Sequence, residues 1–137
     1  MNHVDTLRKM AKPKESKDNQ AIKELVSRSF STRNLLHFKH LETNSYAKHI
    51  ALNELYDEII DDIDEIVESY QGKFGTVKGF FCVQEKSDCI KTTVEKEMNW
   101  LEENKPFISK GFSGLEGLVD DLLADYSQTL YKLKSLG

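Results

Sequence analysis

Hydrophobic residues recur along this chain at the three- and four-residue spacings that place side chains on one face of an α-helix. The pattern occupies four stretches, at about residues 19–41, 45–71, 88–104 and 113–135. In the last stretch, one face carries Leu115, Leu118, Val119, Leu122, Tyr126, Leu130 and Leu133. The sequence therefore predicts an all-α protein built from four amphipathic helices.

Turn-forming residues separate the four stretches. The segment 43–45 supplies cap and turn residues between the first and second helices. We expect the second helix to stop near Gly72 and residues 72–87, with three glycines, to form a crossover loop. We expect Pro106 to end the third helix, which places a loop at 107–114.

The connections between the predicted helices are short, long and short. A first hairpin, a long crossover and a second hairpin are the connectivity of ferritin-like four-helix bundles. At 137 residues a single domain is expected. We therefore predict a ferritin-like bundle over residues 19–137, preceded by a flexible, mildly basic tail over residues 1–18.

The charge balance limits the classes of partner. The net charge of −4 argues against nonspecific nucleic-acid binding by the whole surface. The tail has five basic residues diluted by three acidic ones, which allows weak DNA binding at most. The candidate DNA-binding residues are Arg8, Lys9, Lys12, Lys14 and Lys17.

No apolar run approaches the roughly 20 residues needed to cross a bilayer, and the N-terminal residues lack a secretory pattern. We therefore expect a cytoplasmic protein with no membrane partner. Cys82 and Cys89 are separated by six residues, which is not a common zinc spacing. We interpret them as two reduced thiols, with Cys82 packed in an apolar run.

The second helical stretch is unusually acidic. Residues 50–71 contain no Lys or Arg but carry eight carboxylates, namely Glu54, Asp57, Glu58, Asp61, Asp62, Asp64, Glu65 and Glu68. Like charges four residues apart on a helix repel each other by a few tenths of a kcal/mol per pair. Such a helix needs either plentiful solvent or a positive partner, which could be a basic protein surface or a metal ion.

Four of these carboxylates share the spacing i, i+4, i+7 and i+11. They are Asp57, Asp61, Asp64 and Glu68, and we expect them to form one stripe along the flank of the apolar face. Asp64 and Glu68 lie one turn apart, so they can present two carboxylates to one cation. The same stripe could equally be a solvated helix face.

Histidines precede the acidic stretch. His37 and His40 fall on the inner face of the first helix, while Phe38 points away, and His49 opens the second helix, where it caps or packs. Imidazole combined with carboxylate suits iron, manganese or zinc. A histidine on an apolar face is more often a hydrogen-bonded core residue, so both readings remain open.

Motifs of other enzyme classes are missing. The chain has no glycine-rich phosphate loop, no G-x-S-x-G elbow and no H-E-x-x-H sequence. Nothing specific supports nucleophilic catalysis, and no catalytic residue is assigned.

Two strings carry a family resemblance. TRNLLHFKH at 32–40 and HIALNELYDEIIDDIDEIVESYQGKFG at 49–75 resemble the starvation-induced, DNA-protecting Dps family of ferritin-like proteins. The final helix, at 115–137, is similar to that family's last helix. The chain resembles still more an uncharacterised ferritin-like group of tailed phages, through H-x2-H, T-x-S-x3-H-x-A-L and E-x-Y-Q-G.

The Dps resemblance implies a homo-oligomer with iron bound between subunits. His37, or the competing His40, would come from one subunit, and Asp64 and Glu68 from another. The implied activity is oxidation of Fe(II) followed by iron storage. The sequence departs from the family in having Phe38 where Trp is usual, and no E-x-x-H motif supports a di-iron site within one subunit.

Three functional readings follow. One is a Dps-like iron-binding protein, a possible ferroxidase, with His49, Asp57 and Asp61 as secondary ligands. The alternative is a non-catalytic, phage-type bundle that engages a basic protein partner through its acidic helix. The third is weak DNA binding through the tail. A phage-encoded protein would act in the host cytoplasm.

Overall fold

The computed structural model describes residues 19–83 and 89–136. The tail over residues 1–18, with its five DNA-binding candidates, lies outside the described residues. The helices are α2 (Gln20–Glu42), α3 (Tyr46–Phe74), α4 (Ile90–Ser109) and α5 (Ser113–Ser135). Within the described residues there is no β-strand, so the prediction of an all-α, four-helix protein is confirmed.

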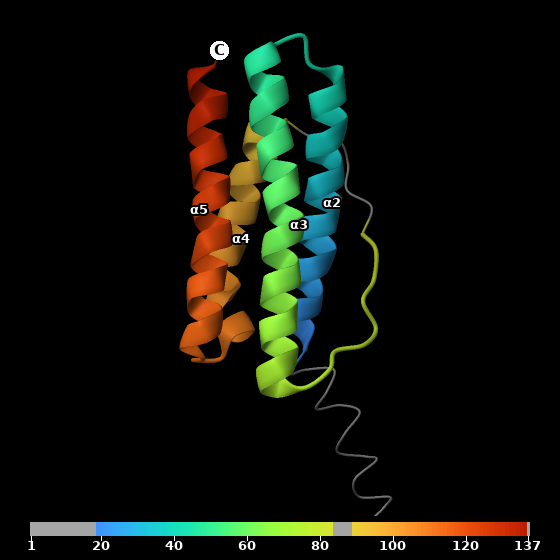
Figure 1. The fold of residues 1–137 in the computed structure, drawn as a ribbon, viewed down its shortest axis with the longest axis vertical. Helices are drawn as coiled ribbons and strands as arrows, with labels where there is room; N and C mark the ends of the chain where they lie inside the picture. The colour runs from blue at the N-terminus through green and yellow to red at the C-terminus, as the bar shows by residue number, and fades with distance from the viewer. Residues whose placement is uncertain (1–18, 84–88, 137) are drawn as a thin grey trace, which may run out of the picture.

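The four helices form a bundle of two hairpins (Figure 1). The first hairpin is α2–α3 and the second is α4–α5. Helix α2 packs against α3 and α4, and α5 packs against the same two helices, so each helix has two main neighbours. Residues 75–83 leave the end of α3 and run back alongside α2, which confirms the long crossover.

A single apolar core fills the space between the helices. It draws on all four of them, with completely or almost completely buried residues in each, such as Leu36, Ile59, Val94 and Leu122. Burying one such side chain stabilises the fold by roughly 1.5–3 kcal/mol. The inner face predicted for the last helix is confirmed, with Leu118 only partly buried.

Helix α3 runs past the expected stop at Gly72. It continues to Phe74, and Gly75 caps it at a φ of 102°, with its N–H donating to the Gln71 carbonyl oxygen at 2.9 Å. The Phe74 ring lies 5.0 Å from the Tyr70 ring, measured between centroids. This aromatic contact offsets the helix penalty of Gly72, which is about 1 kcal/mol. The crossover therefore starts at Gly75.

Helix α4 runs through Pro106, which we had expected to end it. The helix extends to Ser109 although an interior proline costs about 3 kcal/mol. Ile108 is completely buried, and the following turn is held by Lys110, whose Nζ donates to the Tyr70 hydroxyl at 2.6 Å. The packing of this last turn outweighs the proline penalty, and the predicted loop at 107–114 shortens to three residues.

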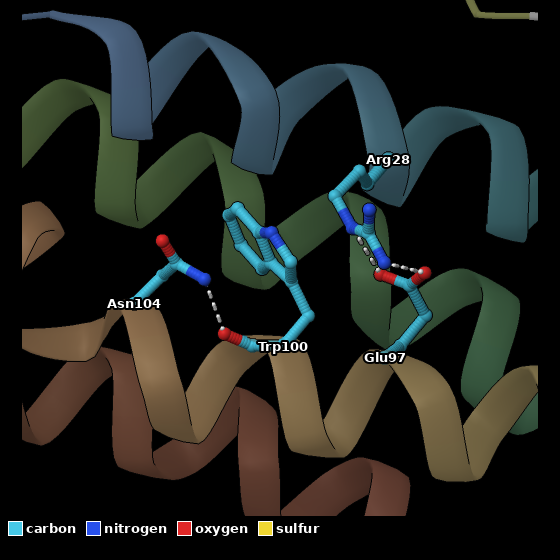
Figure 2. A network of polar contacts seen from close by, with 4 residues as sticks. All are labelled: Arg28, Glu97, Trp100 and Asn104. Carbon is cyan, nitrogen blue, oxygen red and sulfur yellow. Dashed lines mark hydrogen bonds and ion pairs between the residues drawn. The ribbon is translucent and has the colours of Figure 1, made fainter.

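An ion pair joins α2 to α4 (Figure 2). The Arg28 guanidinium donates to both oxygens of Glu97, at 3.2 and 2.9 Å, and lies 4.8 Å from the centroid of the Trp100 ring. The Glu97 side chain is only 6% exposed. A bidentate pair of this kind restrains the orientation of the two side chains as well as the distance between them.

None of the described helices combines the length and the apolar character needed to cross a membrane.

Candidate functional site

His40 and His49 form reciprocal hydrogen bonds across the turn between α2 and α3. The Nδ1 of His40 donates to the backbone oxygen of His49 at 2.7 Å, and the Nδ1 of His49 donates to the backbone oxygen of His40 at 2.8 Å. Carbonyl oxygens only accept, so both Nδ1 atoms carry hydrogen. The two rings stack with centroids 3.5 Å apart. These histidines therefore have a clear structural role, and His49 packs rather than caps.

His37 belongs to an aromatic group one turn earlier on α2. Its ring stacks on Tyr56 of α3 with centroids 4.3 Å apart, and Arg33 lies 5.0 Å from the centroid of the same tyrosine ring. His40 is 8% exposed and His37 is half-buried, so both face the bundle as predicted. Phe38 is 60% exposed, which confirms that it points away.

The acidic stripe lies on the outer face of α3. Asp57, Asp61, Asp64 and Glu68 are all exposed. In steps of about 100° per residue, their mean direction is roughly opposite Ile59, which is completely buried. The stripe therefore does not flank the apolar face as we expected, because Ile59, Ile63 and Ile66 centre the buried face on the other side of the helix.

The predicted metal ligands do not meet within one protomer. Asp64 and Glu68 follow Tyr56 by eight and twelve residues, which is about 12 and about 18 Å along the helix at 1.5 Å per residue. At 100° per residue they are also turned about 80° and about 120° around α3 from Tyr56. In the part of the chain that the structure describes, no three His, Cys, Asp or Glu side chains are grouped to hold a metal ion. A site shared between two subunits stays a prediction.

A carboxyl pair joins α3 to α5 and was not anticipated from the sequence. Burial, followed by the hydrogen bond and charge of Asp125, raises the pKa of Asp62 to about 8. Two ionised carboxylates cannot hydrogen-bond, so this contact requires a shared proton. Without that proton, the buried Oδ2 of Asp62 has no partner among the described residues. Burial and the nearby Asp125 also raise the pKa of Glu58.

The remaining carboxylates of α3 are exposed and largely without cationic neighbours. Of these α3 carboxylates, only Glu54 has an ion pair with a described residue, Lys132 of α5, at 2.9 Å. Asp57 accepts a hydrogen bond from Asn53 at 3.1 Å, which leaves its charge in place. We call Asp57, Asp61, Asp64, Glu65 and Glu68 the acidic face.

The two cysteines remain thiols, as predicted, but Cys82 is exposed rather than packed. It lies in the crossover, where the apolar run that contains it also includes Phe80 and Phe81, each more than 40% exposed. The run does not enter the core because the four helices already fill it.

Comparison with known proteins gives a phage relative and a family. The chain is 27% identical over 97 residues to an uncharacterised 14.6 kDa protein from the mobD-ri intergenic region of Enterobacteria phage T4. The matched region covers 71% of this chain and 75% of that protein. No solved structure matches the chain. No ferritin-like or Dps family is matched, so only the phage part of the expected resemblance is supported. Residues 40–133 match the family described as "Family of unknown function (DUF5856)", and because this match covers more than half of the chain, the protein belongs to that family.

Proposed function

We propose that this protein is a non-catalytic helical bundle that binds a basic protein partner through the acidic face of α3. The observation that carries the proposal is the exposure of Asp57, Asp61, Asp64, Glu65 and Glu68, none of which has an ion pair within the described residues. The similarity to a phage protein is compatible with a small module that acts on another protein.

The energetic logic is that of electrostatic steering. The five carboxylates span twelve residues of α3, or about 17 Å from first to last at 1.5 Å per residue. Each exposed ion pair with a partner would contribute at most about 1 kcal/mol. A row of one sign, however, speeds association with a basic surface and disfavours acidic proteins. The carboxylates repel one another in the free protein, and a basic partner would relieve that repulsion.

The test is affinity capture from a host-cell lysate with charge-reversed baits. We expect a basic protein to bind the wild-type bait and to be lost from the variant Asp57→Lys/Asp61→Lys. The matched control is Glu102→Lys/Glu103→Lys, which makes the same charge change at exposed positions on α4. Binding should survive in the control and weaken steeply with added salt.

Two results would count against the proposal. One is that no captured protein prefers the wild type to the Asp57→Lys/Asp61→Lys variant. The other is that the control loses the same protein, because net charge rather than the acidic face would then explain capture. The metal content should be the same in the wild type and both variants.

A second candidate function is iron binding between subunits of a homo-oligomer. The observation that favours it is the pairing of His40 and His49 with backbone carbonyl oxygens through Nδ1. In metal-binding histidines, the same pairing orients the other ring nitrogen toward the ion. Asp64 and Glu68 are exposed one turn apart, where a second copy of the chain could reach them.

This candidate is tested by iron content and native mass after anaerobic incubation with Fe(II). If it is right, an oligomer holds stoichiometric iron, and the variant Asp64→Ala/Glu68→Ala loses the iron. An iron content of the wild type that is no higher than background would rule out this candidate function. The acidic face would then be a protein-binding surface alone.

A further inference from the structure

The α2–α3 turn and the C-terminus of α5 lie at the same end of the bundle (Figure 1). The residues that line a pocket are found at this end. All four helices or their caps contribute to it, and its volume is about 380 Å³. Its lining residues are Lys39, Glu42, Thr43, Lys48, Leu52, Ile90, Lys91 and Leu133. A pocket of this size is within the range that holds small molecules. It does not include any residue of the acidic face.

The pocket combines an apolar floor with a basic rim. Leu52 and Leu133 are 2% and 1% exposed, and they form the floor with the partly buried Ile90. The rim carries three lysines, Lys39, Lys48 and Lys91, all half-buried. Their stems lie along the apolar floor, and their ammonium groups are placed at its edge.

The rim lysines are poorly neutralised. The Nζ of Lys39 lies 3.9 Å from a carboxylate oxygen of Glu42, which is near the upper limit for an ion pair. The Glu42 side chain is itself 68% exposed, so this pair is weak. Lys48 and Lys91 have no ion pair with any residue in the described ranges. The pocket rim therefore carries a net charge of +2, in a chain whose overall charge is −4.

Lys48 and Lys91 also occupy positions that the helix dipoles disfavour. They lie in the first turns of α3 and α4, and neither first turn contains an acidic residue. A cation at the positive end of a helix is unfavourable, whereas an anion there is stabilised. Lys39 is in the last turn of α2, where the dipole favours it. An anion bound near both lysines would offset this unfavourable placement.

We propose that this pocket binds a small organic phosphate, with an apolar or aromatic body on the Leu52–Leu133 floor and the phosphate between Lys48 and Lys91. The two charges of a phosphate monoester match the net charge of the rim. Lysine serves as a point-charge partner for phosphate. Glu42, on the Lys39 side, disfavours a second anionic group there and so sets the orientation of the ligand.

The competing explanation is that the lysine stems only cover the apolar floor, as long side chains commonly do. That explanation predicts no preference for a phosphate over an uncharged molecule of the same shape. The experiment therefore compares phenyl phosphate, inorganic phosphate and phenol, which separate the body from the charge.

Binding is followed by ¹H–¹⁵N NMR titration of the full chain. We expect saturable shifts at the amides of Lys48, Leu52 and Lys91 with phenyl phosphate, weaker binding of inorganic phosphate, and weaker binding of phenol. The variant Lys48→Gln/Lys91→Gln should bind phenyl phosphate about tenfold or more weakly than the wild type does. The control Lys78→Gln removes an exposed lysine outside the pocket and should bind like the wild type.

Three results would overturn the proposal. They are the absence of saturable shifts in the wild type up to about 10 mM phenyl phosphate, equal binding of phenol and phenyl phosphate, and equal weakening by the control variant. Helical circular dichroism of each variant shows that it is folded, so a loss of binding reports on the pocket. Neither substitution breaks an ion pair with a described residue, so both should be compatible with the fold.

Discussion

At the residue scale, the pairing of Asp62 with Asp125 links the stability of the fold to pH. The pKa of Asp62 is raised from its ordinary value of 3.8 to about 8, chiefly by burial and then by Asp125. Between these two values the folded chain binds more protons at this position than the unfolded chain does. The free energy of unfolding therefore falls as pH rises through this window. The stabilising form is the protonated one, present in full below about pH 4.

The variant Asp62→Asn tests this directly. The asparagine is always neutral and can donate a hydrogen bond. The free energy of unfolding of the variant should therefore match that of the wild type near about pH 4 and exceed it above about pH 8. Asp62 is only partly buried. After allowance for solvent screening, we expect the difference at high pH to be about 1 kcal/mol. Urea unfolding across this pH range measures it. A difference that is the same at about pH 5 and about pH 8.5 would contradict the assignment.

At the element scale, the sequence predicted the existence of each helix better than its ends. Hydrophobic periodicity located all four helices because each has a buried face to mark it. The ends at Gly72 and Pro106 were wrong because local propensity, worth about 1 and about 3 kcal/mol, was outweighed by tertiary contacts. Phe74 lies near Phe112 and Lys110 of the second hairpin, and Ile108 is completely buried. These contacts join residues that are far apart in the sequence, so no local signal reports them.

The candidate site shows the same division. The spacing of Asp57, Asp61, Asp64 and Glu68 correctly indicated one stripe, because helix geometry fixes which residues share a face. Its position opposite the core depended on where the centre of the buried face lay. The Asp62–Asp125 pair and the lysine pocket could not be predicted, because both exist only where separate helices meet.

At the scale of the whole molecule, the two hairpins meet along two main interfaces, and each interface contains a contact between ionisable side chains. The α3–α5 interface contains the carboxyl pair, which weakens when it ionises. The α2–α4 interface contains the Arg28–Glu97 ion pair, which holds the hairpins together at neutral pH. Because the second contact is a bidentate pair that includes an almost buried carboxylate, we expect the loss of one partner to weaken the docking of the hairpins.

The last prediction concerns this ion pair. Arg28→Ala leaves the Glu97 carboxylate, which is 6% exposed, without its guanidinium partner. We expect this change to lower the free energy of unfolding by about 3 kcal/mol. Lys105→Ala is the control, because it breaks an exposed pair with Asp120 and should cost at most about 1 kcal/mol. Urea denaturation measures both. The double variant Arg28→Leu/Glu97→Met should be more stable than Arg28→Ala, since it removes both charges of the pair. Equal losses in Arg28→Ala and Lys105→Ala would contradict a special role of the Arg28–Glu97 pair in the docking of the hairpins.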